Sequence, residues 1–239
     1  MSQLPVRRVE RSPDGAFSPD AWPATVPAVA QVLDAGLDLG PATVLVGENG
    51  SGKSTLVEGI AMSYGLNPEG GSTHARHGTR ASESRLHAAL HLVRGAGSGR
   101  WGYFLRAETM HGLYTYLEDN PGKNDARLHE MSHGESFLEV LRSRFDSPGL
   151  YVLDEPESAL SFSGCLALVG LLHDLSRTGT AQVLVATHSP VIAALPGARI
   201  LELDEFGWHE CAWAELELVG HHRRFLDEPL RYLRHVIDG

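Results

Sequence analysis

Short, almost continuously apolar runs alternate with longer amphipathic segments along the chain. ATVLVG (residues 42–47), LYVLD (150–154) and QVLVAT (182–187) are rich in β-branched residues, which is typical of strands buried on both faces. Helices are expected over residues 26–33, from 53 to about 63, and over 162–179, closing at Gly179. Strands that alternate with helices predict an α/β fold with a mainly parallel sheet.

The remaining segments give weaker patterns. The run LHAALHLVRG (86–95) fits a strand or a helix, although alternation of its apolar residues favours a strand. We also expect an edge strand at 6–10, a strand at 101–108, a helix at 135–145, a hairpin at 199–211 turning near Gly207, and one short helix in the tail 223–239.

A glycine-rich loop follows the first apolar strand. GENGSGKS (47–54) matches the phosphate-loop pattern G-x-x-x-x-G-K-[ST] in full, between a predicted strand and a predicted helix. Its glycines let backbone amides wrap an anion, and the helix adds its dipole. Lys53 is expected to reach the β- and γ-phosphates of ATP, and Ser54 to ligate Mg²⁺. The expected phosphate-binding residues are Gly47, Glu48, Asn49, Gly50, Ser51, Gly52, Lys53, Ser54 and Thr55.

Polar groups also follow the other two apolar strands. Asp154 and Glu155 are adjacent carboxylates, which repel each other unless a cation is near. We expect Asp154 in the metal shell, through a water, and Glu155 where it can take a proton from the attacking water. His188 is expected to hydrogen-bond the γ-phosphate or that water. The alternatives are a solvated acidic turn and a buried structural histidine.

The segment MSHGES (131–136) introduces a family resemblance. Ser132-His133-Gly134-Glu135 resembles the signature motif of ABC-type ATPases, L-S-G-G-E or L-S-G-G-Q, with His133 in place of a glycine. The order of phosphate loop, signature, acidic strand end and histidine is also that of the family, and SALS (158–161) stands where the D-loop falls.

The resemblance implies a mechanism that needs two copies. In ABC-type ATPases two subunits pack head to tail around two Mg-ATP. Ser132 and Gly134 would then act on the ATP of the other subunit, with Glu135 beside them. Lys53, Glu155 and His188 would carry the catalysis.

Four further stretches make the resemblance more specific. GLNPEGGS (65–72), WGYFLRAET (101–109), MSHGESFL (131–138) and GLYVLDEPESALS (149–161) are similar to small stand-alone bacterial ATPases labelled AAA family, which are akin to recombination and chromosome-maintenance ATPases. This implies one P-loop NTPase domain over 1–239: a core lobe (about 1–108 and 145–239) with an antiparallel β subdomain, and a helical signature lobe (109–144). The segment 111–130 is too short for a coiled-coil arm.

Two positions bear on the comparison with transporter ATPases. Glu108 stands near the usual Q-loop glutamine; it could hold Mg²⁺ or orient water, or be a surface acid. Trp22 lies at about the distance of an adenine-stacking aromatic residue, although a hydrophobic anchor in a Pro-rich loop is the interpretation we favour. The histidines of 74–80 are interpreted as exposed loop rather than a metal site.

Charge and composition narrow the possible partners. A formal net charge of −10 makes the chain a poor general binder of DNA or anionic membrane, so DNA binding would need a local basic patch. Cys165 and Cys211 are too few for a disulfide framework and lack metal-site spacing, which fits the cytoplasm. Neither a signal peptide nor a membrane-spanning run is evident, so direct membrane insertion is not expected.

Three functions are compatible with these observations. The main hypothesis is an ABC-type ATPase that forms a homodimer in the ATP-bound state and couples hydrolysis to an unknown protein partner, in DNA repair or defence by kinship. The alternative is the ATP-binding subunit of an ABC transporter, against which the missing Q-loop glutamine counts. A non-enzymatic ATP sensor or DNA-binding module is the third.

Overall fold

The computed structural model describes residues 4–15, 18–73, 84–106, 138–139, 141–142, 145 and 147–237. The strands are β1 Val6–Arg11, β2 Leu37–Asp38, β3 Ala42–Gly47, β4 Gly71–Ser72, β5 Leu90–Arg94, β6 Gly102–Arg106, β7 Leu150–Asp154, β8 Gln182–Thr187, β9 Arg199–Asp204 and β10 Gly207–Glu210. The α-helices are α1 Pro27–Ala35, α2 Lys53–Tyr64, α3 Leu86–Ala89, α6 Phe162–Ser176, α7 Pro190–Ala193, α8 Glu217–Asp227 and α9 Pro229–Ile237; Pro156–Ala159 and Trp213–Glu215 form short 3₁₀ helices.

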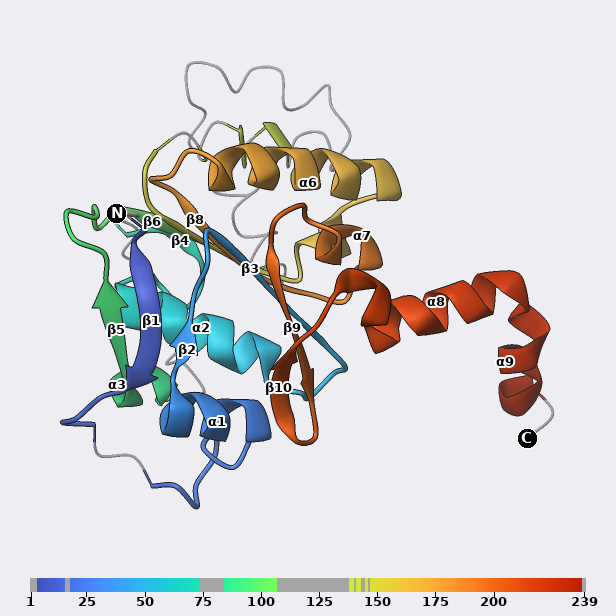
Figure 1. The fold of residues 1–239 in the computed structure, drawn as a ribbon, viewed down its shortest axis with the longest axis horizontal. Helices are drawn as coiled ribbons and strands as arrows, with labels where there is room; N and C mark the ends of the chain where they lie inside the picture. The colour runs from blue at the N-terminus through green and yellow to red at the C-terminus, as the bar shows by residue number, and fades with distance from the viewer. Residues whose placement is uncertain are drawn as a thin grey trace.

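A seven-stranded sheet forms the centre of the molecule, in the order β10-β9-β3-β8-β7-β6-β4 (Figure 1). The five inner strands, from β9 to β6, are parallel to their neighbours, whereas β10 and β4 pair antiparallel at the two edges. This confirms the predicted α/β fold with a mainly parallel sheet. It also brings the carboxyl ends of β3, β8 and β7 to one edge of the sheet.

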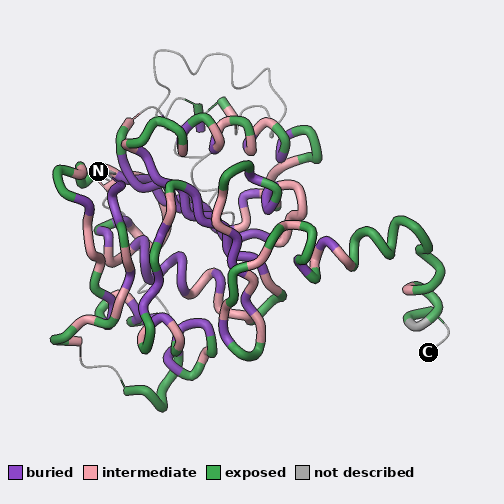
Figure 2. Tube along the Cα trace, in the orientation of Figure 1, coloured by how far each residue is buried: buried purple, intermediate pink, exposed green. Residues whose placement is uncertain are grey.

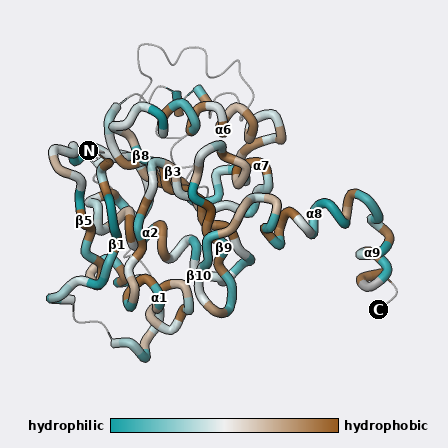
Figure 3. The backbone as a smooth tube through the Cα atoms, in the orientation of Figure 1, coloured by the Kyte–Doolittle hydropathy of each residue, from teal (hydrophilic) through white to brown (hydrophobic). Residues whose placement is uncertain are grey.

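Side chains of the central strands alternate between two apolar cores. In β7, Tyr151 and Leu153 face the core formed with α6, whereas Leu150 and Val152 face the core formed with α2. The strands β3 and β8 divide in the same way, which makes a three-layer arrangement of helix, sheet and helix. Figure 2 shows the buried residues concentrated in these strands, and Figure 3 shows the same strands as strongly hydrophobic.

A second, three-stranded antiparallel sheet packs beside this centre, in the order β2-β1-β5. It confirms the predicted antiparallel β subdomain. The predicted edge strand at 6–10 is wrong in one respect, because β1 lies between two partners. Val6 and Val9 are both fully buried in the core shared with α2, although they stand three residues apart, because the register of β1 against β5 shifts between Val6 and Arg8.

Gln182 joins the two sheets. Its side chain is fully buried at the start of β8, where Oε1 accepts from the Val6 N–H at 2.9 Å. Its Nε2 donates to the carbonyl oxygens of Val6 (2.7 Å) and Gly40 (2.9 Å). One amide therefore satisfies three backbone groups of neighbouring segments, a role that the apolar pattern of β8 does not reveal.

Two other predicted elements need correction. The segment 86–95 is neither wholly strand nor wholly helix, since α3 gives way to β5 at Leu90. The tail holds two helices rather than one, because Pro229 cannot continue α8 and starts α9 instead. The pair α8–α9 extends away from the central sheet and ends in the C-terminus (Figure 1), with most of its residues exposed (Figure 2).

Other predicted elements are found as expected. The helix that starts at Lys53, the strand within 101–108 and the hairpin at 199–211 are all present, although α6 stops at Ser176, before Gly179. Most of the predicted signature lobe 109–144 and most of the predicted helix at 135–145 lie outside the described residues. Within the described part of the chain, no helix is long and apolar enough to cross a membrane.

Replacing Gln182 with Ala should lower the free energy of unfolding by about 1–3 kcal/mol, because it leaves buried backbone groups of Val6 and Gly40 without partners. Gln31→Ala is the matched control. Gln31 also exchanges two hydrogen bonds with a backbone, that of Trp208, but it is only half-buried and water can replace it. Urea unfolding followed by circular dichroism measures both losses. Equal losses would contradict the proposed effect of burial.

Candidate functional site

The loop between β3 and α2 has a shape that only glycine allows at two positions. Gly52 adopts φ 98° and ψ 5°, in the left-handed region, and a Cβ there would lie 2.6 Å from Cγ1 of Val26. A Cβ on Gly47 would lie 2.4 Å from the carbonyl oxygen of Leu203 in the adjacent strand β9. The glycines of the motif are therefore required by the backbone path and by close packing.

The start of α2 fits an anion. Gly52 is the N-cap residue and supplies no side chain, so no side chain caps the first-turn amides. The Ser51 hydroxyl oxygen is buried and has no hydrogen-bond partner among the described residues. Free helical N–H groups and a buried, unpaired hydroxyl in one loop match the oxygens of a phosphate.

Lys53 is buried within this loop, with only 3% of its surface exposed. Its Nζ donates to the carbonyl oxygens of Gly47 (2.8 Å) and Glu48 (2.9 Å). Burial lowers the pKa of Lys53, and the nearby carboxylates of Glu155, Asp154, Glu157 and Glu48 oppose this shift. The lysine is thus a buried cation inside a group of acids.

Asp154 ends β7 and faces the start of α2. Its Oδ1 accepts from the Ser54 hydroxyl at 3.0 Å, so the two residues predicted to share a metal are in contact. Arg106 is paired with Asp154 in the register of β6 and β7, and its Nε lies 3.8 Å from Oδ2. Arg106 also donates to Glu58 at 2.8 Å.

Glu155 occupies an unusual backbone conformation at φ 50° and ψ 50°, and is the one non-glycine residue with positive φ among those described. Its N–H donates to the Ala186 carbonyl at 2.9 Å, which ties the turn to β8. Left-handed backbone at a non-glycine residue costs energy and is concentrated at functional sites. The turn directs Glu155 toward His188, and its Oε1 lies 3.3 Å from His188 Nε2.

Glu157 fixes His188 from the other side. Its Oε1 accepts from the Thr187 hydroxyl at 2.8 Å and from the His188 N–H at 2.5 Å. Its Oε2 is buried and has no hydrogen-bond partner among the described residues. His188 Nε2 also has no hydrogen-bond partner among them, although it lies 3.3 Å from Glu155 Oε1.

Two residues of this site were not identified from the sequence. Arg106 stands two positions before Glu108, and only Glu108 was considered as a site residue in that segment. Glu157 follows Asp154 and Glu155, the two acids to which the sequence assigned roles. A charged residue at the end of a buried strand is the signal that could have identified Arg106. Glu157 has no comparable signal, because its contacts depend on the pairing of β7 with β8.

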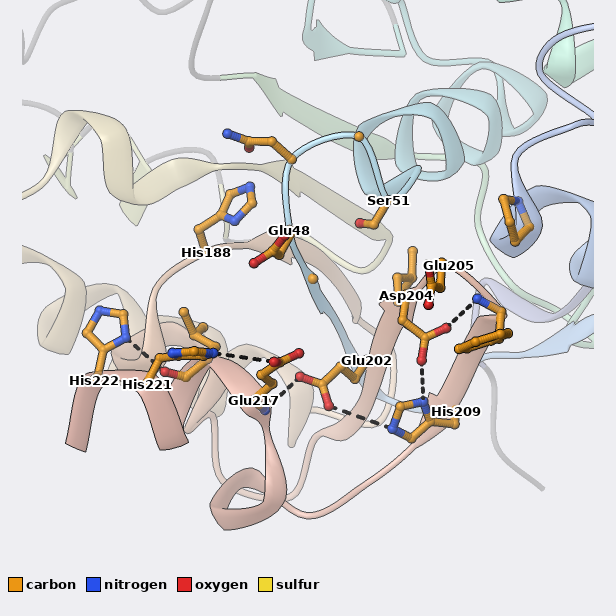
Figure 4. A pocket seen from close by; sticks show the side chains of 17 residues that line it. Glu48, Ser51, His188, Glu202, Asp204, Glu205, His209, Glu217, His221 and His222 are labelled. Atoms are coloured by element: carbon orange, nitrogen blue, oxygen red, sulfur yellow. Dashed lines mark hydrogen bonds and ion pairs between the residues drawn. The ribbon is translucent and has the colours of Figure 1, made fainter. Parts of the chain in front are cut away.

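A groove of about 1070 Å³ runs along the phosphate loop (Figure 4). The loop and His188 line one side of it, and the β9–β10 hairpin and the start of α8 line the other. Trp22 is exposed and is not among the lining residues.

The remaining predicted site residues cannot be placed. Glu108, Ser132, Gly134 and Glu135 lie outside the described residues, as does the histidine-containing segment 74–80. Of the predicted residues that are described, Lys53, Ser54, Asp154, Glu155 and His188 gather at the carboxyl ends of β3, β7 and β8.

Comparison with known proteins agrees with this geometry. The family profile described as "ABC transporter" matches residues 31–158, just over half of the chain. The aliphatic sulfonates import ATP-binding protein SsuB 2 of Rhodococcus jostii is 31% identical over 179 residues, which cover 72% of this chain and 71% of that protein. The zinc import ATP-binding protein ZnuC of Vibrio cholerae is 27% identical over 195 residues, covering 80% and 72%.

Solved structures that resemble the chain are more distant. Structure matches include cbiO1 from Clostridium perfringens, described as part of the ABC transporter complex cbiONQ (TM-score 0.45, 16% identity, 85% of this chain and 90% of that one). The SMC head domain from Thermotoga maritima is another (TM-score 0.42, 18% identity, 74% and 92%). Because the profile spans half of the sequence and a relative above 30% identity spans more than two thirds of both proteins, the chain belongs to the ABC transporter family and is an ATPase that hydrolyses ATP to ADP and phosphate.

Proposed function

We propose that the chain is the ATP-hydrolysing subunit of an ABC transporter and works as a homodimer around two Mg-ATP. The observation that carries the proposal is the meeting of three strand ends: Lys53 and Ser54 after β3, Asp154 and Glu155 at the end of β7, and His188 after β8. The contacts Ser54–Asp154 and Glu155–His188 join these strand ends directly.

Hydrolysis would proceed by in-line attack of water on the γ-phosphorus. Glu155 is proposed to accept a proton from that water as the new O–P bond forms and the bond to the ADP oxygen breaks. His188 is proposed to hydrogen-bond the γ-phosphate or the water. Glu157 is proposed to hold His188 through its backbone N–H, so that Nε2 stays directed at Glu155.

The residues around Asp154 fit a magnesium ion. Ser54 and Asp154 offer the hydroxyl and carboxylate oxygens that Mg²⁺ prefers, and they are already within 3.0 Å of each other. When bound, Mg²⁺ supplies positive charge that neutralises the phosphate oxygens. Lys53 would bind the β- and γ-phosphates, and the four nearby carboxylates favour its charged form against the burial that lowers its pKa.

The second subunit is proposed to complete each site. Ser132, Gly134 and Glu135 would contact the ATP held by the other copy, and the segment 109–144 would form a signature lobe set on the core lobe. This assignment rests on the motif and on the family.

The transporter setting replaces the main hypothesis drawn from the sequence. The sequence relatives reported above are named as import ATP-binding proteins, and neither is named for DNA repair or defence. Glu108 in place of the Q-loop glutamine is therefore weaker evidence against a transporter subunit than the sequence identity over most of both chains is evidence for it. The partner would then be a membrane-embedded subunit, and this chain would be held at the membrane through it.

Glu155→Gln should reduce ATP turnover by about 10²–10⁴-fold, since the amide cannot accept the proton. ATP would then hold the dimer together, and size-exclusion chromatography with light scattering should show a dimer with ATP and a monomer without it. Glu10→Gln, in the three-stranded sheet, is the control with the same change of charge. A monomeric Glu155→Gln protein with normal turnover would contradict this role.

Glu157→Leu should lower kcat by up to about 100-fold, because the loss of the carboxylate lets His188 shift by a fraction of an ångström or more. Glu157→Gln keeps an acceptor oxygen and should stay within a few-fold of wild type. The dissociation constant of ATP should change in neither variant. If Glu157→Gln were as impaired as Glu157→Leu, the carboxylate charge rather than the positioning of His188 would be what matters.

The proposed partner can be tested with Glu155→Gln protein and ATP in detergent-solubilised membranes of the native host. A polytopic membrane protein should co-purify in stoichiometric amount, and its reconstitution with the wild-type chain should raise ATP turnover. Lys53→Ala protein, which should not bind ATP, is the matched negative control for this co-purification. If the ATP-dependent partners all lacked membrane spans and turnover did not respond to membrane components, the stand-alone function would be favoured instead.

A further inference from the structure

Three side chains with metal-binding chemistry meet on the β9–β10 hairpin, apart from the site that binds ATP. One ligand atom each from Glu202, His209 and Cys211 lies within 4.8 Å of the other two. His209 Nε2 lies 3.6 Å from Glu202 Oε2. Ligands around a tetrahedral metal are separated by about 3–4 Å, given bond lengths of about 2.0–2.3 Å. Small side-chain adjustments would therefore bring the three ligand atoms to the distances found around a bound metal ion.

The pairing of the two strands creates this cluster. His209 is directly opposite Glu202 in the antiparallel register, so their side chains project from the same face. Cys211 follows β10 on that face, two residues beyond His209, and its N–H donates to the Ile200 carbonyl at 3.2 Å. The backbone of all three residues is thus held by the hairpin.

Neighbouring groups orient two of these ligands. The Oε1 atom of Glu202 accepts from the Glu217 N–H at 2.8 Å, at the start of α8, which leaves Oε2 directed at His209. On the other side of the imidazole, His209 Nδ1 lies 3.6 Å from Asp204 Oδ2. Figure 4 shows the ring of His209 between Glu202 and Asp204. A carboxylate that holds one imidazole nitrogen while the other binds metal is a common arrangement in metal sites.

The charges around the cluster favour a cation. Glu202, Asp204, Glu210 and Glu215 are close by in sequence or in contact, and the pKa of the Cys211 thiol is raised, first by burial and then by Glu202 and Glu215. Among the cations nearby, Arg199 is engaged with Glu210 at 2.8 Å. A divalent ion would offset this excess of acid and would displace the thiol proton on binding.

We propose that Glu202, His209 and Cys211 form a binding site for a borderline-soft divalent metal ion, of which Zn²⁺ is the best match. Sulfur, nitrogen and oxygen donors together suit Zn²⁺ and disfavour Mg²⁺, which prefers oxygen. Asp204 is the positioning residue for His209. The fourth coordination position faces the groove, because Glu202 and His209 line it. This site is separate from the proposed magnesium site at Ser54 and Asp154.

Titration of the purified full chain with Co²⁺, which reports thiolate coordination by its near-ultraviolet absorption, tests the proposal. One equivalent should produce the sulfur-to-cobalt band, and Zn²⁺ should displace the cobalt. Cys211→Ser should abolish the band, and His209→Ala should weaken Co²⁺ binding while leaving the fold intact, because that side chain is exposed. Asp204→Asn should weaken binding by about 10–100-fold. Cys165→Ser removes the other thiol and should change nothing.

Several results would overturn the proposal. The proposal is wrong if the wild-type protein shows no thiolate band, if the band survives in Cys211→Ser, or if the band is lost in Cys165→Ser. If metal bound without a thiolate band and His209→Ala did not affect the binding, the metal would be assigned instead to the other histidines of the groove, which are His188, His221 and His222. Circular dichroism of each variant shows whether a loss of binding follows from unfolding.

Discussion

The buried ammonium group of Lys53 is the electrostatic centre on which the site depends. It lies where the backbone of the phosphate loop closes around it, and four carboxylates act on it while burial lowers its pKa. Without this cation, Asp154, Glu155 and Glu157 would repel one another at the ends of β7 and its following turn. With it, a cluster of acids can stay beside a phosphate-binding loop. The carboxylates suit a divalent cation such as Mg²⁺, and the ammonium group of Lys53 suits the phosphates.

This arrangement requires strands that are buried on both faces. The inner strands end next to one another and have apolar cores on both faces, so β3, β8 and β7 present polar groups at their tips and mostly apolar side chains along their length. The left-handed turn at Glu155 is held by the Ala186 carbonyl of the neighbouring strand. The strain of that turn is therefore supported by strand pairing rather than by the turn itself.

Residues whose role follows from local order could be predicted from the sequence. The phosphate loop, Asp154, Glu155 and His188 each follow directly from a strand with an unmistakable apolar pattern, and the structure brings them together. Arg106, Glu157 and Gln182 act through partners on other strands, so their roles depend on register, which one sequence does not show. The central place of β1 was missed for the same reason: a strand's pattern shows which face is buried, and not how many neighbours it has.

The β9–β10 hairpin illustrates this limit and its consequence. The spacing of Glu202, His209 and Cys211 resembles no metal motif in the sequence, yet a two-residue turn after Asp204 brings Glu202 opposite His209. On the other face of β9, Leu203 pairs with Gly47 and belongs to the core beneath the phosphate loop. Glu202 and Asp204 are the immediate chain neighbours of Leu203. A change in coordination at Glu202 would thus act one residue away from Leu203, the register partner of Gly47 in the nucleotide-binding loop.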